Sequence, residues 1–174
     1  MAGRWSTGMD RMGEMIVSAA PSRSKKPPTE LQKAQWREFC GANLFAKRVQ
    51  KDVSLFQQDS VVATTKGWRS VRNLAIADYF ALPEIWEIDT SLYTGQAGSV
   101  ITIIVTTLLR TKKVNIMIYS PDGTVLENGD ATPESDDQTW KYITTSANPS
   151  LTSSKIVVMA VSVPGNQSSE QTTL

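Results

Sequence analysis

The sequence predicts an α+β protein in which an N-terminal extended arm and a helical hairpin are followed by an immunoglobulin-like antiparallel β-sandwich. Three observations predict this class. Apolar residues recur at helical spacing before Pro83, they alternate with polar residues after it, and Pro27 and Pro28 separate both patterns from the start of the chain. The expected parts are an arm and linker over 1–28, helices over 29–82, the sandwich over 83–167 and a frayed tail over 168–174.

The first part of the chain holds one apolar patch, Met15-Ile16-Val17, within a segment rich in Met, Ser and Arg. We expect one strand there, near residues 14–19. Arg23, Lys25 and Lys26 follow and keep the linker solvated. An arm with a linker is the simpler interpretation. The alternative is a strand that pairs with a neighbouring subunit, because sheet edges offer unpaired donors and acceptors to an extended segment.

Two helices are expected between Thr29 and Pro83. Thr29 and Gln32 form a capping-box pair that begins the first helix, and a loop at 57–60 separates it from a second helix over 66–82. Gly41 indicates a close contact or a break. The first helix should bury Leu31, Phe39, Ala42, Phe45, Ala46, Val49, Val53 and Phe56, and the second Trp68, Val71, Leu74, Ala75, Tyr79 and Leu82.

The sequence predicts opposite burial for Cys40 and Trp36 of the first helix. Cys40 excludes an intramolecular disulfide and is expected to be a small core residue. Trp36 lies off the apolar stripe, so we expect it to be exposed and a candidate interface residue.

From Glu84 onward the period changes to two, which is typical of strands that bury one face. Pro121-Asp122-Gly123 is a turn signal. Val114, Ile116 and Ile118 should share one face of their strand, as should Trp140, Tyr142 and Thr144. The expected strands cover 85–88, 100–108, 113–119, 125–126, 139–145 and 156–163, and this number of short strands favours an immunoglobulin-like sandwich without a disulfide.

The residue inventory argues against an enzyme and against a cofactor. There is no histidine, which removes the usual general base and metal ligand, and no nucleophile or phosphate-loop motif is present. Carboxylates near 84–89, and Glu134, Asp136 and Asp137, leave calcium open in principle. The preferred interpretation of Asp136 and Asp137 is a solvated acidic loop, and no metal site is predicted.

Charge is divided unevenly along the chain. Residues 1–82 hold 13 Lys and Arg against 7 Asp and Glu, whereas residues 83–174 hold 5 against 10. Oppositely charged ends can attract copies of the chain to one another. A nucleic-acid partner is not expected, since the front is only mildly basic and carries no recognition motif. No apolar stretch is long enough for membrane insertion, and the first residues are not expected to act as a secretory signal.

Several short motifs are distributed over most of the chain. They are P-T-E-L-Q-K-A-Q-W-R-E-F at 28–39, A-D-Y-F at 77–80, P-E-I at 83–85, I-D at 88–89, Y-T-G-Q-A-G at 93–98, D-G-T-V-L-E-N-G at 122–129, W-K-Y at 140–142 and V-P-G-N at 163–166. Together they resemble a family of small, functionally uncharacterised bacterial proteins with a helical N-terminal part and an immunoglobulin-like C-terminal β-sandwich. The resemblance implies one repeated architecture, with helices and sandwich packed together, and no activity.

The first functional hypothesis is a non-enzymatic structural subunit that assembles with itself into a filament, tube or phage-like particle. Its predicted interface residues are Met15, Ile16, Val17, Arg23, Lys25, Lys26 and Trp36. The alternative is a monomeric immunoglobulin-like binding module for a glycan or protein, with Asp136, Asp137 and Trp140 as its binding-loop candidates. Synthesis in the cytoplasm is expected, and the final location, extracellular or particle-associated, is left open.

Overall fold

The computed structural model describes residues 5–9, 15–19 and 26–174. The chain divides into two compact units, Met1–Glu38 and Phe39–Leu174. The part of the chain from Phe39 to Pro83 therefore belongs to the same unit as the sandwich. No helix in the described part of the chain has the length and apolar character needed to cross a bilayer.

The first unit contains a β-hairpin and the beginning of a long helix. Strands β1 (Trp5–Met9) and β2 (Met15–Ala19) are antiparallel. The strand expected near residues 14–19 is thus present, but it pairs with β1 instead of forming a lone extended segment. Helix α1 (Glu30–Lys51) begins with the expected capping box: the Gln32 N–H donates to Thr29 Oγ1 at 3.3 Å, and the Thr29 N–H donates to Gln32 Oε1 at 3.0 Å.

Three helices form where a hairpin of two was expected. After α1 come α2 (Val53–Thr65) and α3 (Val71–Phe80). Asp52 separates α1 from α2 because its backbone is extended and its side chain accepts from the Leu55 N–H at 3.1 Å, which caps a new helix. The loop expected at 57–60 was wrong, since α2 runs through it. Ser70 caps α3 in the same way, through the Asn73 N–H at 3.2 Å.

The helical core is smaller than the apolar stripes predicted. It consists of Ala46, Val49, Ala63, Val71, Leu74 and Ala75, with Phe45, Trp68 and others packed around it. Five residues expected to be buried are exposed instead: Leu31, Phe39, Val53, Phe56 and Leu82. Cys40, expected in the core, is also exposed. Helical spacing gives the direction of a face, but a residue is buried only where another element covers that face.

Of the two alternatives expected at Gly41, a close contact or a break in the helix, the structure shows the close contact. A Cβ at this position would lie 2.5 Å from Tyr79 Oη, so α1 and α3 approach each other here more closely than a larger residue would allow.

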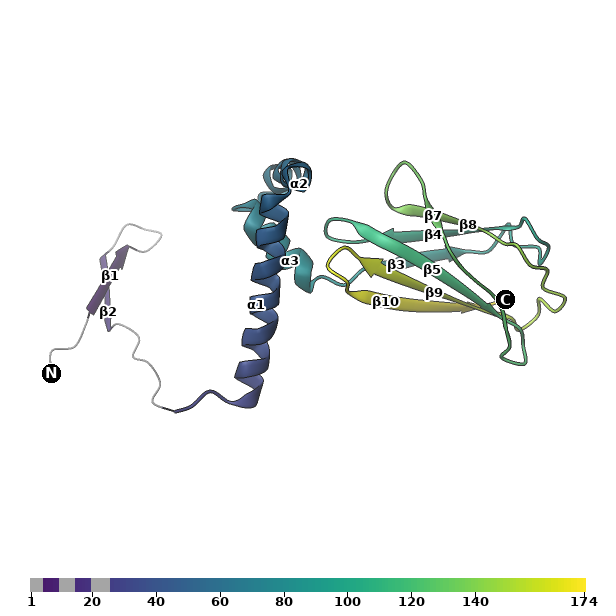
Figure 1. Ribbon diagram of the computed structural model, residues 1–174, viewed down its shortest axis with the longest axis horizontal. Helices are drawn as coiled ribbons and strands as arrows, with labels where there is room; N and C mark the ends of the chain where they lie inside the picture. Colours follow the sequence, from purple (N-terminus) through teal and green to yellow (C-terminus); the bar gives the residue numbers. More distant parts are fainter. Residues whose placement is uncertain (1–4, 10–14, 20–25) are drawn as a thin grey trace. The chain divides into compact units, whose positions relative to one another are not determined.

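Two four-stranded antiparallel sheets form the sandwich (Figure 1). One has the order β3-β4-β8-β7, and the other has the order β10-β9-β5-β6. Assigned in chain order, these correspond to the ABED and GFCC′ sheets of immunoglobulin-like domains, which confirms the predicted architecture. The strands are β3 (Glu84–Asp89), β4 (Val100–Thr106), β5 (Thr111–Tyr119), β6 (Val125–Asp130), β7 (Thr132–Pro133), β8 (Thr139–Ile143), β9 (Lys155–Ser162) and β10 (Gln167–Thr173).

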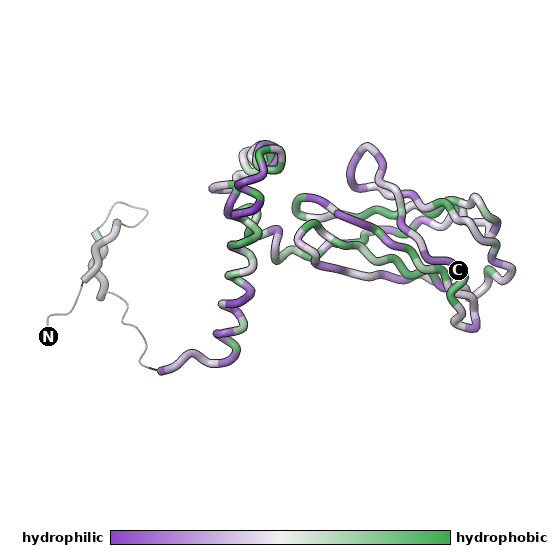
Figure 2. The backbone as a smooth tube through the Cα atoms, in the orientation of Figure 1, coloured by the Kyte–Doolittle hydropathy of each residue, from purple (hydrophilic) through white to green (hydrophobic). Residues whose placement is uncertain are grey.

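Alternation along the strands builds the core between the sheets. In β4, β5 and β9 every second residue is buried, and Trp140 and Tyr142 of β8 join them as predicted. Figure 2 shows the hydrophobic residues concentrated in the strands and a hydrophilic loop between β7 and β8. The fully buried aliphatic residues of the sandwich are Ile101, Ile103, Val105, Val114, Ile116, Ile118, Ile156, Val158 and Ala160.

The end of the chain is ordered as a strand. The tail expected to fray over 168–174 forms most of β10, whose residues pair with β9 from Gln167 opposite Val161 to Thr173 opposite Lys155. Its composition is polar because an edge strand can leave most of its side chains in solvent while its backbone completes the sheet.

Candidate interaction surfaces and the helix–sandwich junction

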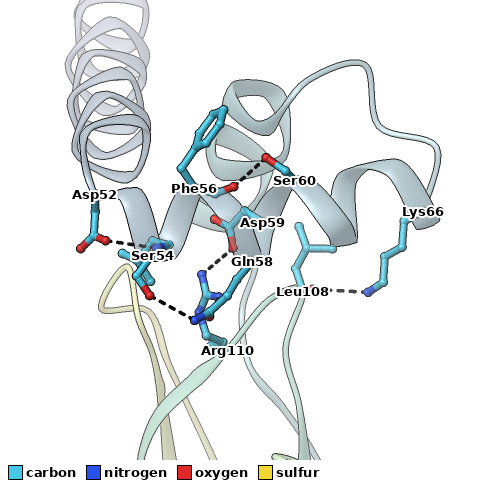
Figure 3. Close-up of polar contacts among 10 residues, drawn as sticks. Asp52, Ser54, Phe56, Gln58, Asp59, Ser60, Lys66, Leu108 and Arg110 are labelled. Atoms are coloured by element: carbon cyan, nitrogen blue, oxygen red, sulfur yellow. Dashed lines mark hydrogen bonds and ion pairs between the residues drawn. The ribbon is translucent and has the colours of Figure 1, made fainter.

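The turn between β4 and β5 joins the sandwich to the helices. Leu108 and Leu109 pack against the helical core, and Lys66 Nζ at the end of α2 donates to the Leu108 carbonyl at 3.4 Å (Figure 3). Two large apolar side chains at the tip of a sheet are therefore partly covered by the helices. This contact explains why helices and sandwich behave as one unit.

A buried ion pair crosses the same junction. Arg110 Nη2 lies 2.6 Å from Asp59 Oδ1 in α2, and Arg110 Nη1 donates to Gln58 Oε1 at 3.0 Å (Figure 3). The Asp59 side chain is fully buried. Within the described part of the chain, Asp59 Oδ2 and Arg110 Nε have no hydrogen-bond partner. Loss of Arg110 would leave the charge of the fully buried Asp59 without its ion-pair partner.

Asp78 of α3 adds a second buried carboxylate to this cluster. Burial raises its pKa from 3.8 to about 6, and the charge of Asp59 acts in the same direction, while the Leu109 N–H and the Arg110 charge oppose the shift. The cluster thus contains two carboxylates and one guanidinium from three elements. Sequence reasoning did not single out any of these residues, since no local pattern distinguishes a buried Asp in a helix from a solvated one.

A second polar contact fastens the end of α3. Asn166, in the turn between β9 and β10, donates through Nδ2 to the carbonyls of Tyr79 at 2.7 Å and Ala81 at 2.8 Å. The final carbonyls of a helix lack partners within the helix, so a side-chain amide satisfies them here. Together with Arg110, this bond fixes the helices to one end of the sandwich.

Glu127 organises the loop that follows β8. Its carboxylate accepts from Tyr142 Oη at 2.8 Å, from the Thr145 N–H at 2.6 Å and from Thr145 Oγ1 at 2.7 Å. Burial alone would raise the pKa of Glu127, but these hydrogen bonds together lower it. Burial and the Glu127 contact raise the pKa of Tyr142. These bonds join β6, β8 and the loop that follows β8 through one carboxylate.

The aromatic residue of the predicted binding loop is buried and not available to a ligand. Trp140 was a candidate for ligand contact, but it is only 5% exposed and packs in the sandwich core. Asp136 is exposed, yet its carboxylate accepts from the Thr139 N–H at 2.9 Å and from Thr139 Oγ1 at 2.6 Å. These bonds lower the pKa of Asp136 and shape its own loop. Asp137 is exposed, with a left-handed backbone at φ 57°.

No metal centre is formed by the residues that the structure describes, since no three His, Cys, Asp or Glu side chains come together in a ligating group. The acidic residues of β3 and those of the β7–β8 loop lie in separate elements.

The N-terminal interface candidates are only partly described. Met15 is 72% exposed, and Ile16 and Val17 lie opposite Gly8 and Thr7 in the hairpin. Arg23 and Lys25 lie outside the described residues.

Lys26 and Trp36 contribute to one hollow at the start of α1. Both are exposed, and Trp36 is 60% exposed as predicted. The remaining lining residues are Pro27, Pro28, Thr29, Gln32 and Gln35.

The sandwich presents a groove between two of its edge strands. Strands β3 and β10 lie next to each other although they belong to different sheets. Trp86 of β3 is 67% exposed, and its Nε1 donates to Thr106 Oγ1 at 2.7 Å, which holds the ring in place. The groove is lined by Ile85, Trp86, Glu87, Ile88, Glu170, Gln171 and Thr172. Sequence reasoning missed it because the two strands are about eighty residues apart.

Comparisons with known proteins add little. No family model matches the chain, and no curated protein matches it significantly. Among solved structures, the crystal structure of CopC from Methylosinus trichosporium OB3b aligns with a TM-score of 0.39 and 13% sequence identity, over 51% of this chain and 87% of that chain. A TM-score of this size carries no argument about function.

Proposed function

We propose that the protein is a non-enzymatic structural subunit that associates with copies of itself, head to tail, through its N-terminal end. The observation that carries this proposal is the state of the first three turns of α1. No residue from Glu30 to Cys40 is buried. Leu31 is 82% exposed and Trp36 is 60% exposed. Burying one such side chain contributes about 1.5–3 kcal/mol, which favours an arrangement in which a partner covers this helix.

The distribution of charge supports a copy of the same chain as that partner. Residues 1–82 carry an excess of Lys and Arg, whereas residues 83–174 carry an excess of Asp and Glu. A basic front and an acidic back attract each other between molecules and speed their encounter at low salt. A head-to-tail contact repeats on every subunit, so it builds a ring where it closes and a filament where it does not.

The test is the mass of the full chain in solution, measured by light scattering over a concentration series up to about 50 µM at low and at high salt. We expect oligomers that dissociate as salt increases. A variant with Leu31→Glu and Trp36→Glu should be monomeric at the same concentrations.

Leu44→Glu is the matched control for this variant, because Leu44 lies later in α1 and is 57% exposed. It should assemble like the parent protein. A parent protein that stays monomeric throughout the series would refute the proposal, and so would unchanged assembly of the Leu31→Glu and Trp36→Glu variant.

A further inference from the structure

We propose that the free edge of β3 in one copy receives the N-terminal hairpin of a second copy as additional strands. This inference rests on the proposed self-association and names the surface that accepts the arm. It follows from the edges of the sandwich, the lining of one groove and the charges of the two partners.

The two sides of the sandwich differ in how their edges end. On one side, β6 continues through Ala131 into β7, so the chain itself crosses from sheet to sheet, and β7 is two residues long with Pro133 in it. Short strands and prolines protect an edge from further pairing. On the other side, β3 has six residues and β10 has seven. Each pairs with a single strand, as β6 does, but neither is joined to a strand of the other sheet through a single residue. This side is open to strand addition.

β3 also carries apolar and aromatic side chains that an added strand could contact. Ile85 and Ile88 are partly buried against the core and form the apolar part of the groove. Trp86 is held by its bond to Thr106 while most of its surface faces solvent. An ordered, exposed aromatic beside an unpaired strand provides contact area at little cost in side-chain entropy. β10 has no large apolar residue, so β3 is the better acceptor.

Charge matches the N-terminal arm to this groove. The acidic residues Glu84, Glu87 and Asp89 lie on β3, and Glu170 lies on β10, and neither strand contains Lys or Arg. Lysine at an edge commonly prevents pairing with other chains, and this edge lacks it. Residues 1–28 carry five Lys and Arg against two Asp and Glu.

The hairpin matches β3 in length, and pairing with another strand would stabilise it. Strands β1 and β2 have five residues each, close to the six of β3. A two-stranded hairpin is at best marginally stable alone in water, so pairing with a third strand stabilises it. Backbone hydrogen bonds then supply affinity, and the basic and acidic side chains supply selectivity for this edge.

A complementation experiment with full-length chains tests the inference. The acceptor variant carries Glu87→Lys and Glu170→Lys, both at exposed positions of the groove. The donor variant carries Thr7→Pro and Val17→Pro, which lie opposite each other in the hairpin and block pairing by both strands. Masses of each variant and of their equimolar mixture are measured by analytical ultracentrifugation at about 50 µM.

We expect each variant to be monomeric and the mixture to form dimers and nothing larger, because only one productive junction remains between the two chains. A control with Glu134→Lys and Asp137→Lys makes the same change in net charge on the β7–β8 loop and should assemble like the parent protein. The acceptor change should weaken association at least tenfold.

Three results would overturn the inference. If the parent assembles and the acceptor variant assembles equally well, the arm docks elsewhere and self-association stands. If the parent assembles but the mixture remains monomeric, the hairpin does not pair with β3 of another copy. Pairing of the hairpin with the sandwich of its own chain would give this result. If the parent is monomeric, both this inference and the proposed self-association fail.

Discussion

Replacement of Asp78 by Asn should stabilise the protein at neutral and alkaline pH. Asp78 is 2% exposed, and burial raises its pKa from 3.8 to about 6. Because the folded pKa lies above the unfolded value, the folded protein binds this proton more tightly. The group therefore favours folding fully below about pH 4, and that contribution is lost as the pH rises through about 6.

The size of the effect follows from the two pKa values. A difference of about two pH units, at about 1.4 kcal/mol per unit, gives a cost of about 3 kcal/mol for holding the ionised Asp78 at about pH 8. At about pH 4.5 the same relation gives a cost of about 1 kcal/mol. The amide that replaces the carboxylate carries no charge, so Asp78→Asn should gain up to these amounts. The pKa of about 6 already includes the attraction of the ionised group to Arg110.

The assay is urea unfolding followed by tryptophan fluorescence, at one fixed protein concentration so that association does not alter the comparison. The measured quantity is the difference in unfolding free energy between Asp78→Asn and the parent at about pH 4.5 and about pH 8. Other carboxylates titrate in both proteins and cancel in this difference. Asp137→Asn is the control, since Asp137 is exposed and Asn tolerates its left-handed backbone.

Two results would refute this reasoning. The first is a loss of stability in Asp78→Asn that is equal at both pH values, which would show that Asp78 is needed for its hydrogen bond and not penalised for its charge. The second is a pH-dependent gain of the same size in Asp137→Asn, which would show that the effect does not depend on burial.

Two further substitutions test the contacts that hold the second unit together. Arg110→Ala should cost about 3–5 kcal/mol in unfolding free energy at neutral pH, because it leaves the fully buried Asp59 unpaired. In a protein that already carries Asp59→Ala, the same Arg110→Ala change should cost far less. Equal costs with and without Asp59→Ala would exclude coupling between the two side chains. Gly129→Ala should cost about 1–3 kcal/mol in a thermal or urea melt, since a Cβ there would lie 2.7 Å from Tyr142 Cε2 and push the ring away from Glu127. If Gly129→Ala leaves the stability unchanged, the Tyr142 ring moves aside freely and the reasoning is wrong. Gly8→Ala is the control, because a Cβ at Gly8 would have no atom within 4 Å.

The strands of the sandwich could be predicted because alternation is a local property of the chain. Val114, Ile116 and Ile118 alternate with Asn115 and Met117, and the pleat alone directs the first set inward. The same pattern in β4 and β9 was sufficient to indicate two sheets with a shared core. The helix start at Thr29 was equally predictable, since a capping box involves residues only three apart.

The helices were less predictable because burial depends on what covers them. Leu31 and Phe39 were assigned to the same apolar stripe as Ala42 and Val49, yet only the latter pair is buried. Asp52 ends the expected first helix early because its side chain caps a new one. An N-cap contributes only about 1 kcal/mol, so sequence alone does not show whether a helix will continue or restart there. Cys40 and Trp140 were misjudged for the same reason: a residue type has a preference for inside or outside, and the packing of distant elements decides it.

By itself, the sequence determined that helices precede strands, which side chains of the central strands face inward, and that the two halves of the chain carry opposite net charges. Each of these depends on residues close together in the chain. Only the tertiary structure decided that Asp59, Asp78 and Arg110 share one buried cluster, and that β3 and β10 border one acidic groove. These arrangements join residues tens of positions apart, and no local spacing encodes which distant element will supply the partner.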